Sequence, residues 1–224
     1  MIKKLFDELK NNKKKRICVI ILMLFVVVLI LFAILWFNGI VGNYISEDEK
    51  RFKSEYESLN DVINEDDELA YLKIKLPKKN NIKYSNISEI VDIFNSDGDA
   101  VIYFGYPSCT YCRSAVQVLC NTVKKTKLKT IYYLDVEENN DRYKELIDIM
   151  GNKFTVDDKG VELYTPLVVF VANGDIVSHN KGTLFSQKTP YIKLDKSQVK
   201  GLSEIYEYGV KDVLRSIEIK NSVK

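Results

Sequence analysis

The chain begins with a long stretch that has no polar face. Residues 17–37 read ICVIILMLFVVVLILFAILWF, which is 21 consecutive residues without a charge. A helix of that length extends about 31 Å, enough to cross the hydrocarbon core of a bilayer. A helix on the surface of a soluble domain keeps one polar side toward water, and this run has none. The pattern therefore predicts a transmembrane helix at residues 17–37.

A cleavable signal peptide is the alternative for this segment. The apolar region of a signal peptide is usually about 7–15 residues long and ends at small residues that mark the cleavage site. The run here is longer, and no A-x-A pattern follows it. Trp36 and Phe37 close it with aromatic rings, which favour a membrane interface. These features favour an uncleaved anchor.

A regular alternation of helices and strands begins near Ser85. Apolar residues recur at helical spacing in some segments, whereas others are short continuous apolar runs typical of buried strands. Helices are predicted at residues 87–94, 109–126, 140–150 and 201–219, and strands at residues 100–104, 130–136, 166–172 and 175–178. Asn173-Gly174 between the last two strands is a strong hairpin signal. Helical crossovers followed by a hairpin predict an α/β fold with a mixed sheet flanked by helices.

Residues 38–84 carry a different pattern. The segment 46–59 (SEDEKRFKSEYESL) is strongly charged with few apolar positions, which indicates a solvated helix or stalk. Short alternating stretches such as LKIKL, ended by Pro77, indicate an accessory edge strand within residues 70–84. The predicted organisation is a basic tail at residues 1–16, the transmembrane helix at 17–37, a charged stalk or N-terminal extension at 38–84, and an α/β domain at 85–220.

The charge of the chain is unevenly distributed. Residues 1–16 hold seven basic and two acidic residues, a net charge of +5, whereas the whole chain is +2, so the remainder carries −3. A mildly acidic domain lacks the basic surface of a nucleic-acid-binding protein. The KNNKKKR cluster adjoins the start of the apolar run, and residues 38–49 beyond its end carry only acids. The positive-inside rule then places the N-terminus in the cytoplasm and the C-terminal domain outside the cell membrane.

The chemistry-bearing motif is Cys109-Thr110-Tyr111-Cys112, which follows a predicted buried strand and opens a predicted helix. Unpaired N–H groups and the helix dipole at that position favour an anion, so we expect a stabilised Cys109 thiolate with a low pKa. Cys112 lies almost one helical turn later, close enough to attack a mixed disulfide on Cys109. The motif predicts a redox dithiol with an exposed first sulfur and a more buried second sulfur.

Two structural roles for the same cysteines stay open. A CxxC can be half of a zinc site, but the other candidate ligands are Cys18 in the apolar run, Cys120 on the same helix, and His179. The sequence has no second CxxC and no histidine pair, so we expect no metal. A static structural disulfide is the other alternative, although a strand–CxxC–helix arrangement is more often redox-active.

Residues 85–220 resemble the thioredoxin superfamily. The CxxC of that family matches Cys109 and Cys112, and its cis-proline, which opens the strand before the hairpin, matches Thr165-Pro166 in YTPLVVFVANGDIV. The resemblance implies a thioredoxin-like fold in which the proline loop packs against the dithiol. It also implies that Thr165 offers its backbone N–H and C=O to an extended substrate peptide. An ordinary strand-opening proline is the alternative for Pro166.

The sequence departs from thioredoxin at several positions. Thr110-Tyr111 replaces the Gly-Pro between the cysteines, and Ser108 replaces the preceding tryptophan. Tyr103 stands where thioredoxin has a buried acid for proton transfer, which puts thioredoxin-like reducing power in doubt. Residues 152–163 look like an insertion. The FGYPSCTYCR run around the cysteines also resembles bacteriocin-transport accessory proteins, a membrane-linked thioredoxin-like group.

Other residues that carry chemistry have structural interpretations. Cys120 is expected as a core thiol on the apolar helix face and Cys18 in the membrane, whereas His179 and two acidic pairs are expected on the surface. Three tyrosines and a proline form either an apolar rim that docks substrate or part of the core. The acidic pairs are Glu137-Glu138 and Asp157-Asp158, and the rim residues are Tyr106, Pro107, Tyr111 and Tyr164.

The sequence predicts a membrane-anchored thiol–disulfide oxidoreductase that acts outside the membrane on exported polypeptides. Cys109 would attack the substrate and Cys112 would resolve the mixed disulfide, while Thr165, Pro166 and Tyr111 would bind the peptide. No cofactor is needed, but turnover requires an electron-transfer partner in the membrane. The alternative is a non-catalytic accessory module of a transport or secretion system, and delivery of a metal by the dithiol is a weaker third hypothesis. The direction of electron flow stays open.

Overall fold

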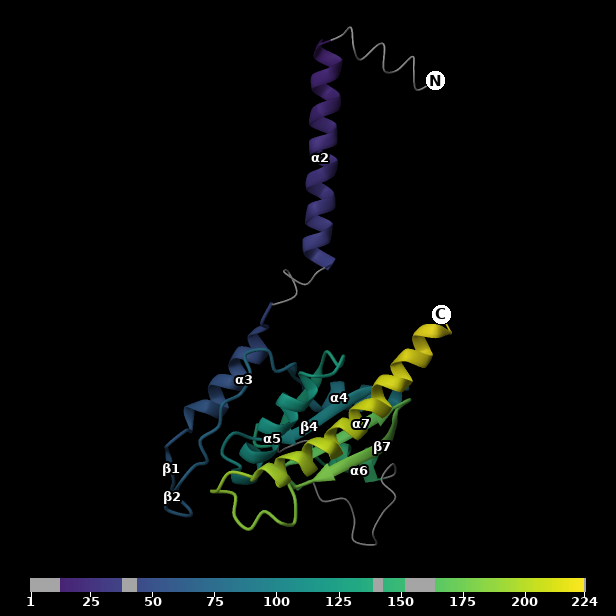
Figure 1. The fold of residues 1–224 in the computed structure, drawn as a ribbon. Coiled ribbons are helices and arrows are strands. Elements are labelled where there is room, and N and C mark those ends of the chain that lie inside the picture. The colour runs from purple at the N-terminus through teal and green to yellow at the C-terminus, as the bar shows by residue number, and fades with distance from the viewer. Residues whose placement is uncertain (1–12, 38–43, 139–142, 152–163, 224) are drawn as a thin grey trace. The chain divides into compact units, whose positions relative to one another are not determined.

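The computed structural model describes residues 13–37, 44–138, 143–151 and 164–223, in two units that divide between Tyr44 and Ile45. The first unit contains helix α2, Lys13–Phe37 (Figure 1). Within α2, Ile17–Ile34 is long and apolar enough to cross a membrane, and none of this segment is buried. The predicted helix is therefore confirmed as a helix, and its composition is that of a membrane anchor or of a signal sequence.

The second unit is built around a mixed sheet. Its strands are β3 Ile82–Tyr84, β4 Ala100–Gly105, β5 Ile131–Asp135, β6 Leu167–Ala172 and β7 Asp175–Lys181. Their order across the sheet is β3-β5-β4-β6-β7. Strands β3 and β4 run parallel to β5, whereas β6 runs antiparallel to both β4 and β7. This order and these directions are those of the thioredoxin fold, so the predicted fold class is confirmed.

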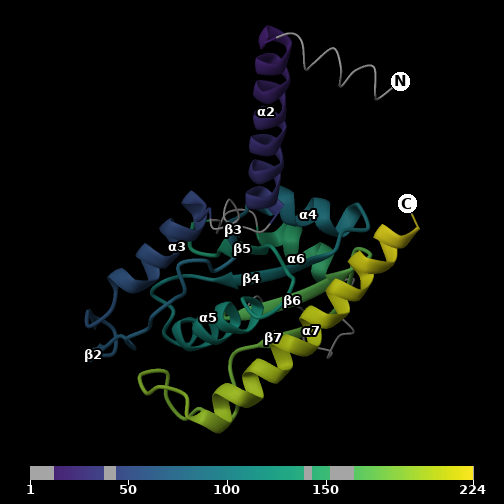
Figure 2. The ribbon, with the colours of Figure 1, turned by 45° about the horizontal axis from the view of Figure 1, so that its top comes forward.

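Helices cover both faces of this sheet. They are α3 Glu47–Ser58, α4 Ile87–Asn95, α5 Thr110–Val123, α6 Tyr143–Gly151 and α7 Lys196–Ser222. Helices α5 and α7 lie side by side over one face, together with α3, and α4 and α6 cover the other (Figure 2). Neighbouring strand residues point to opposite faces. Val101 and Tyr103 of β4 therefore join the α3–α5–α7 core, whereas Ile102 and Phe104 join the α4–α6 core.

The hairpin between β6 and β7 forms at the predicted dipeptide. Asn173 and Gly174 both have positive φ, 53° and 73°, the backbone conformation that a two-residue turn between twisted strands requires. Gly174 also has no room for a side chain, because a Cβ there would lie 2.7 Å from the Phe94 carbonyl oxygen. The turn chemistry thus fixes both the hairpin and its contact with the end of α4.

Helix α3 is not the solvated stalk that its charges indicated. Ser46 caps the helix: its Oγ accepts the N–H of Glu49, whose carboxylate accepts the N–H of Ser46. Phe52 and Tyr56, one turn apart, are fully buried in the same core cluster as Tyr103. The helix itself is confirmed, but the stalk interpretation is wrong for α3, because two aromatic residues suffice to form a buried stripe on one side of a charged helix.

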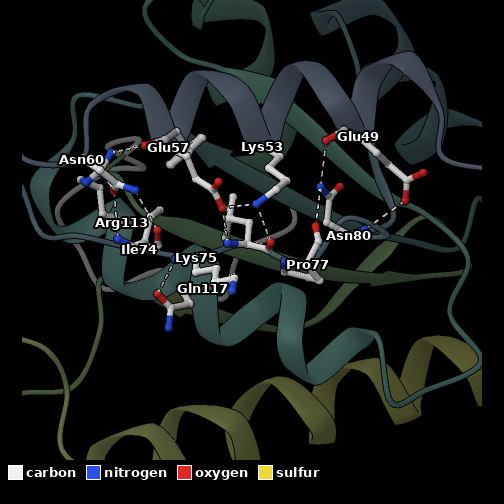
Figure 3. Close-up of polar contacts among 12 residues, drawn as sticks. Glu49, Lys53, Glu57, Asn60, Ile74, Lys75, Pro77, Asn80, Arg113 and Gln117 are labelled. Carbon is white, nitrogen blue, oxygen red and sulfur yellow. Dashed lines mark hydrogen bonds and ion pairs between the residues drawn. The ribbon is translucent and has the colours of Figure 1, made fainter.

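The segment after α3 replaces strand pairing with side-chain hydrogen bonds. An edge strand does form within residues 70–84, as predicted, but its placement at LKIKL is wrong, because residues 71–78 form no strand. Leu72, Ile74 and Leu76 are buried, as their alternation indicated. The backbone N–H groups bind side-chain oxygens: Ile74 to Asn60 at 3.0 Å, Lys75 to Gln117 at 3.4 Å and Leu76 to Glu57 at 2.7 Å (Figure 3). The edge strand of the sheet is β3 instead, and residues 45–84 belong to the compact unit.

The remaining predicted elements differ mainly at their ends. Helix α7 begins at Lys196 rather than at Gly201, because Asp195 and Gln198 form a capping box. A small ribbon of β1 Ile63–Asn64 and β2 Leu69–Ala70 was not predicted. The predicted insertion at residues 152–163 lies outside the described residues.

Candidate active site

The cysteines of the CxxC motif close a disulfide at the start of α5. Strand β4 ends at Gly105, and Cys109 is the N-cap residue of α5, where its Sγ accepts the N–H of Cys112 at 3.1 Å. The two Cα atoms are 5.1 Å apart. Cys109 is 7% exposed and Cys112 is 0% exposed. Cys109 is therefore the less buried residue of the two, as predicted, but the prediction that it is exposed is wrong, because both residues are buried.

The N-cap position gives Cys109 the electrostatic environment that the sequence predicted. The N–H groups of the first helical turn lack intrahelical partners and carry the positive end of the helix dipole. One of them, on Cys112, already points at Cys109 Sγ. In the reduced protein the same N–H is in position to donate to a Cys109 thiolate.

The proline loop lies at the end of the sheet from which the CxxC motif emerges. The Thr165–Pro166 peptide bond is cis, as the family resemblance implied. Leu167, which follows it, pairs with Phe104 at the end of β4. The Pro166 carbonyl accepts the N–H of Gly182 at 2.7 Å, which joins the loop to the end of β7. The structure therefore brings Thr165 and Pro166 to the strand end that leads into the dithiol.

An open groove of about 410 Å³ lies beside these two parts of the site, and neither cysteine nor Pro166 is among its lining residues. Its lining residues are Tyr111, Tyr164, Thr165, Lys181, Gly182, Thr183, Leu184, Phe185 and Gln187. Phe185 is fully exposed, and the Lys181 ammonium lies 3.8 Å from the centre of the Tyr164 ring. Of the predicted rim, Tyr111 and Tyr164 line the groove, whereas Tyr106 packs against the core. The wall that follows β7 had no signal in the sequence.

Tyrosines occupy the layer beneath the disulfide. Tyr103, at the position of thioredoxin's buried acid, is fully buried, and its hydroxyl lies 3.0 Å from that of Tyr56. A Cβ on Gly105 would lie 2.5 Å from the Tyr103 hydroxyl and 3.2 Å from Cys112 Sγ, so both atoms border this glycine. Burial raises the pKa of Tyr103 and of Tyr56 well above the usual range. The groups that border the dithiol on this side are therefore neutral hydroxyls, at a position where thioredoxin has a carboxylic acid.

Arg113, the residue after Cys112, was missed by the sequence reasoning. A charged residue on an amphipathic helix is expected in solvent, but Arg113 is 0% exposed. Its guanidinium donates to the Tyr56 carbonyl in α3, to oxygens of Asn60 and Leu72 in the segment that follows α3, and to the Pro107 carbonyl. Burial lowers the pKa of this guanidinium, but an arginine stays charged at neutral pH.

The other candidate residues stay outside the site. Cys120 is fully buried, and burial raises the pKa of its thiol to about 12, so it is an unreactive core thiol as predicted. His179 lies on an exposed position of β7, and Glu137 and Glu138 are exposed. Among the described residues, no group of His, Cys, Asp and Glu side chains could hold a metal ion. The pair Asp157-Asp158 lies outside those residues.

Comparison with known proteins gives similarity of fold only. No protein-family model and no curated protein sequence matches the chain. Thioredoxin O1 from Arabidopsis thaliana in its oxidized state has 17% identity and a TM-score of 0.36, covering 57% of this chain and 99% of that one. A mutant thioredoxin from Halobacterium salinarum has 20% identity and a TM-score of 0.31, covering 58% and 93%. A protein described as an oxidoreductase with a thioredoxin fold has 16% identity and a TM-score of 0.35, covering 46% and 83%.

Proposed function

We propose that this chain is a thiol–disulfide oxidoreductase whose reacting groups are Cys109 and Cys112. The observation that carries the proposal is the disulfide at the start of α5, with one sulfur at the N-cap and the other fully covered. A reversible dithiol needs one reachable sulfur at a position that stabilises its thiolate, and a second sulfur that outside thiols do not reach. The geometry at the start of α5 meets both requirements.

The reaction proceeds by two thiol–disulfide exchanges. When a substrate is oxidised, a substrate thiolate attacks Cys109 Sγ, the Cys109–Cys112 bond breaks, and Cys112 leaves as a thiolate that takes up a proton. The second substrate thiol then loses its proton and attacks the substrate sulfur of the mixed disulfide, which releases Cys109 as a thiolate. Two electrons pass from substrate to protein, and the reverse sequence reduces a substrate disulfide.

The groove supports a polypeptide as substrate. Thr165 lines it together with Tyr111, and the backbone N–H and C=O of Thr165 are the groups that an extended peptide would pair with, while Pro166 holds that loop. The exposed ring of Phe185 offers apolar surface at the side of the groove. An exported peptide with a cysteine in an extended segment fits this arrangement, and the likeness of FGYPSCTYCR to bacteriocin-transport accessory proteins supports such peptides as substrates.

The N-terminal segment supports action outside the cell membrane. Helix α2 contacts lipid in this proposal, with the basic tail in the cytoplasm and residues 45–224 outside. A dithiol outside the membrane reacts once and then needs its electrons removed or replaced. We therefore also propose an electron-transfer partner in the same membrane.

Trapping the mixed disulfide tests the chemistry. With Cys112→Ser, Cys109 should form a stable adduct with a fluorescent peptide that carries a disulfide, because the resolving sulfur is gone. Cys109→Ser should form none, and Cys120→Ala should exchange like the unmodified chain. Cellular function that survives Cys109→Ser at normal protein levels would instead favour a non-catalytic accessory module.

A further inference from the structure

The residue that follows Cys112 in α5 carries a fully buried guanidinium. Arg113 Nη1 donates to the Tyr56 carbonyl at 2.7 Å and to the Pro107 carbonyl at 3.3 Å. Its Nε donates to the Leu72 carbonyl at 3.0 Å, and its Nη2 donates to Asn60 Oδ1 at 2.8 Å. Figure 3 shows Arg113 and Asn60 facing each other between α5 and the segment after α3. The hydrogen bonds hold the charged group in one place.

All four acceptors of this cation are neutral oxygens. The nearest aromatic ring, that of Tyr71, is centred 5.5 Å from the guanidinium carbon and supplies a quadrupole but no charge. By contrast, the buried carboxylate of Glu49 has the Lys79 ammonium beside it at 3.0 Å. Arg113 forms no such ion pair with the described residues. A buried cation without a counter-charge is costly, since hydrogen bonds replace only part of its hydration.

Because Arg113 is next to the dithiol in the chain, its charge can affect the redox equilibrium of the two sulfurs. Arg113 follows Cys112 directly, its backbone N–H donates to the Cys109 carbonyl at 3.3 Å, and its side chain binds Pro107, two residues before Cys109. In the disulfide form both sulfurs are neutral and the cation stays unbalanced. Reduction creates a thiolate at Cys109, and the low dielectric of the interior strengthens the attraction between the two charges.

We propose that Arg113 is a fixed buried cation that favours the reduced form of Cys109–Cys112 and so makes the disulfide an oxidant of substrate dithiols. The inference rests on the function proposed above and gives it a direction. Electrons flow from the two thiols of an exported peptide into the Cys109–Cys112 bond, which breaks, and they leave to a disulfide-bearing membrane protein. Tyr56 at the end of α3 and Asn60 and Leu72 in the segment after it supply three of the four oxygens, so this part of the chain holds the charge that sets the redox equilibrium. Arg113 acts as a positioning and electrostatic residue and does not touch the reacting atoms.

Most other ionisable groups near the dithiol do not neutralise the charge of Arg113. The tyrosines that face it, Tyr56, Tyr71 and Tyr103, have pKa values raised by burial and are neutral at pH 7. Glu137, 3.4 Å from the Ser108 hydroxyl, is exposed, so water screens its charge. None of these groups offsets the guanidinium.

One buried carboxylate lies at the same end of the sheet. Asp135, paired with Gly105 at the end of β4, accepts the Tyr133 hydroxyl at 3.0 Å and the N–H of Glu137 at 2.9 Å. These donors hold the carboxylate in place, and Arg113 does not donate a hydrogen bond to it. This carboxylate is present in both redox states of the cysteine pair. Its contribution to the reduction potential therefore cancels when a variant of Arg113 is compared with the unmodified chain.

Two variants test the charge of Arg113 in different ways. Arg113→Met removes the cation, and Asn60→Asp places a carboxylate of the same shape 2.8 Å from it without removing any group of the guanidinium. Asn86→Asp adds the same negative charge at the exposed N-cap of another helix, α4, and is the matched control.

The readouts are the glutathione equilibrium of the cysteine pair in the full chain in detergent, and the pH at which Cys109 thiolate absorbance appears. Both Arg113→Met and Asn60→Asp should shift the equilibrium toward the disulfide by about tenfold, which is about 30 mV for this two-electron couple. They should also raise the pKa of Cys109 by about one unit. Asn86→Asp should stay within about threefold of the unmodified chain.

A purely structural role for Arg113 predicts a different result. If Arg113→Met does not fold, Asn60→Asp decides, because it keeps the guanidinium and every oxygen that the guanidinium binds, and of the hydrogen bonds of Asn60 it loses only the one from Nδ2 to the Ile74 carbonyl. An unchanged equilibrium and an unchanged Cys109 pKa in Asn60→Asp would overturn the inference, and so would a wild-type pair that glutathione leaves oxidised. Neither result touches the trapping experiment with Cys112→Ser, so the proposed function and the direction of electron flow fail separately.

Discussion

Tyr56 of α3 and Tyr103 of β4 bring their hydroxyl oxygens to 3.0 Å of each other inside the protein. Both side chains are fully buried, in the same core cluster as Cys109 and Cys112. Because Tyr56 comes from the charged segment that precedes the sheet, that segment forms part of the wall behind the dithiol. The contribution of this segment can therefore be measured as a change in the free energy of unfolding, and not only as a change in the redox equilibrium.

We expect Tyr56→Ala to lower the free energy of unfolding by about 3–5 kcal/mol, as aromatic truncation in a core does. Tyr56→Phe removes only the hydroxyl and should cost about 1 kcal/mol. Urea unfolding of the full chain in detergent, followed by near-ultraviolet circular dichroism, gives both values. Tyr208→Ala, at a position 67% exposed on α7, should change little. A Tyr56→Ala cost as small as that of Tyr208→Ala would mean that α3 is only a tether.

Glu49 makes stability depend on pH. Its carboxylate, 1% exposed, accepts the N–H groups of Ser46, Asn80 and Asn81 and pairs with Lys79. Burial alone would raise the pKa of this carboxyl, but the hydrogen bonds and Lys79 outweigh that effect and lower it. A carboxyl with a lowered folded pKa stabilises the fold above its unfolded pKa, and this contribution is lost as the pH falls through the folded pKa.

Glu49→Gln should therefore cost about 1–3 kcal/mol at pH 7 and progressively less as the pH falls below about 4.3, where the stabilising contribution of the wild-type carboxylate begins to be lost. Urea unfolding at a series of pH values gives the difference between the two chains. Glu47→Gln, which changes an exposed carboxylate on the same helix, should show no such trend. A Glu49→Gln penalty that is constant with pH would contradict the ionised, hydrogen-bonded carboxylate.

Phe185 should matter for peptides and not for the redox equilibrium. Its ring is fully exposed at the groove and is free of the core, so Phe185→Ala leaves the fold unchanged. We expect the rate constant for exchange with a peptide of about ten residues to fall roughly fivefold, the effect of losing a modest apolar contact, while exchange with glutathione stays the same. Ile192→Ala, at an exposed position outside the groove, is the control. An equal loss for glutathione and peptide would move the peptide site elsewhere.

The strands, the hairpin and the dithiol were predictable because their signals are local. Asn173-Gly174 needs only its own backbone freedom, and Cys109 needs only a strand before it and a helix after it. The alternation in LKIKL correctly indicated an extended segment with one buried side, but its hydrogen-bond partners are side chains such as Asn60 and Gln117. Which partner an extended segment finds depends on tertiary structure that periodicity does not encode.

The burial of Arg113 escaped prediction for a related reason. An arginine on a helix is expected in water unless distant groups satisfy its donors. Those groups come from Tyr56, Asn60 and Leu72, more than forty positions earlier in the chain. The same segment looked like a stalk because its charges outnumber its apolar residues. The part of the site that sets its electrostatics is thus the part with the longest sequence separations.

The orientation of the anchor can be tested with single cysteines. The basic cluster before α2 predicts a cytoplasmic N-terminus, so the compact unit should be outside. In a chain without other cysteines, Lys200→Cys, at an exposed position on α7, should react with a membrane-impermeant maleimide in intact cells. Lys13→Cys, at the exposed start of α2, should react only after lysis. A removed signal sequence would instead give a mature chain from which Lys13→Cys is lost, and the reverse labelling pattern would place the dithiol in the cytoplasm, where reducing thiols would keep Cys109 and Cys112 from storing oxidising equivalents.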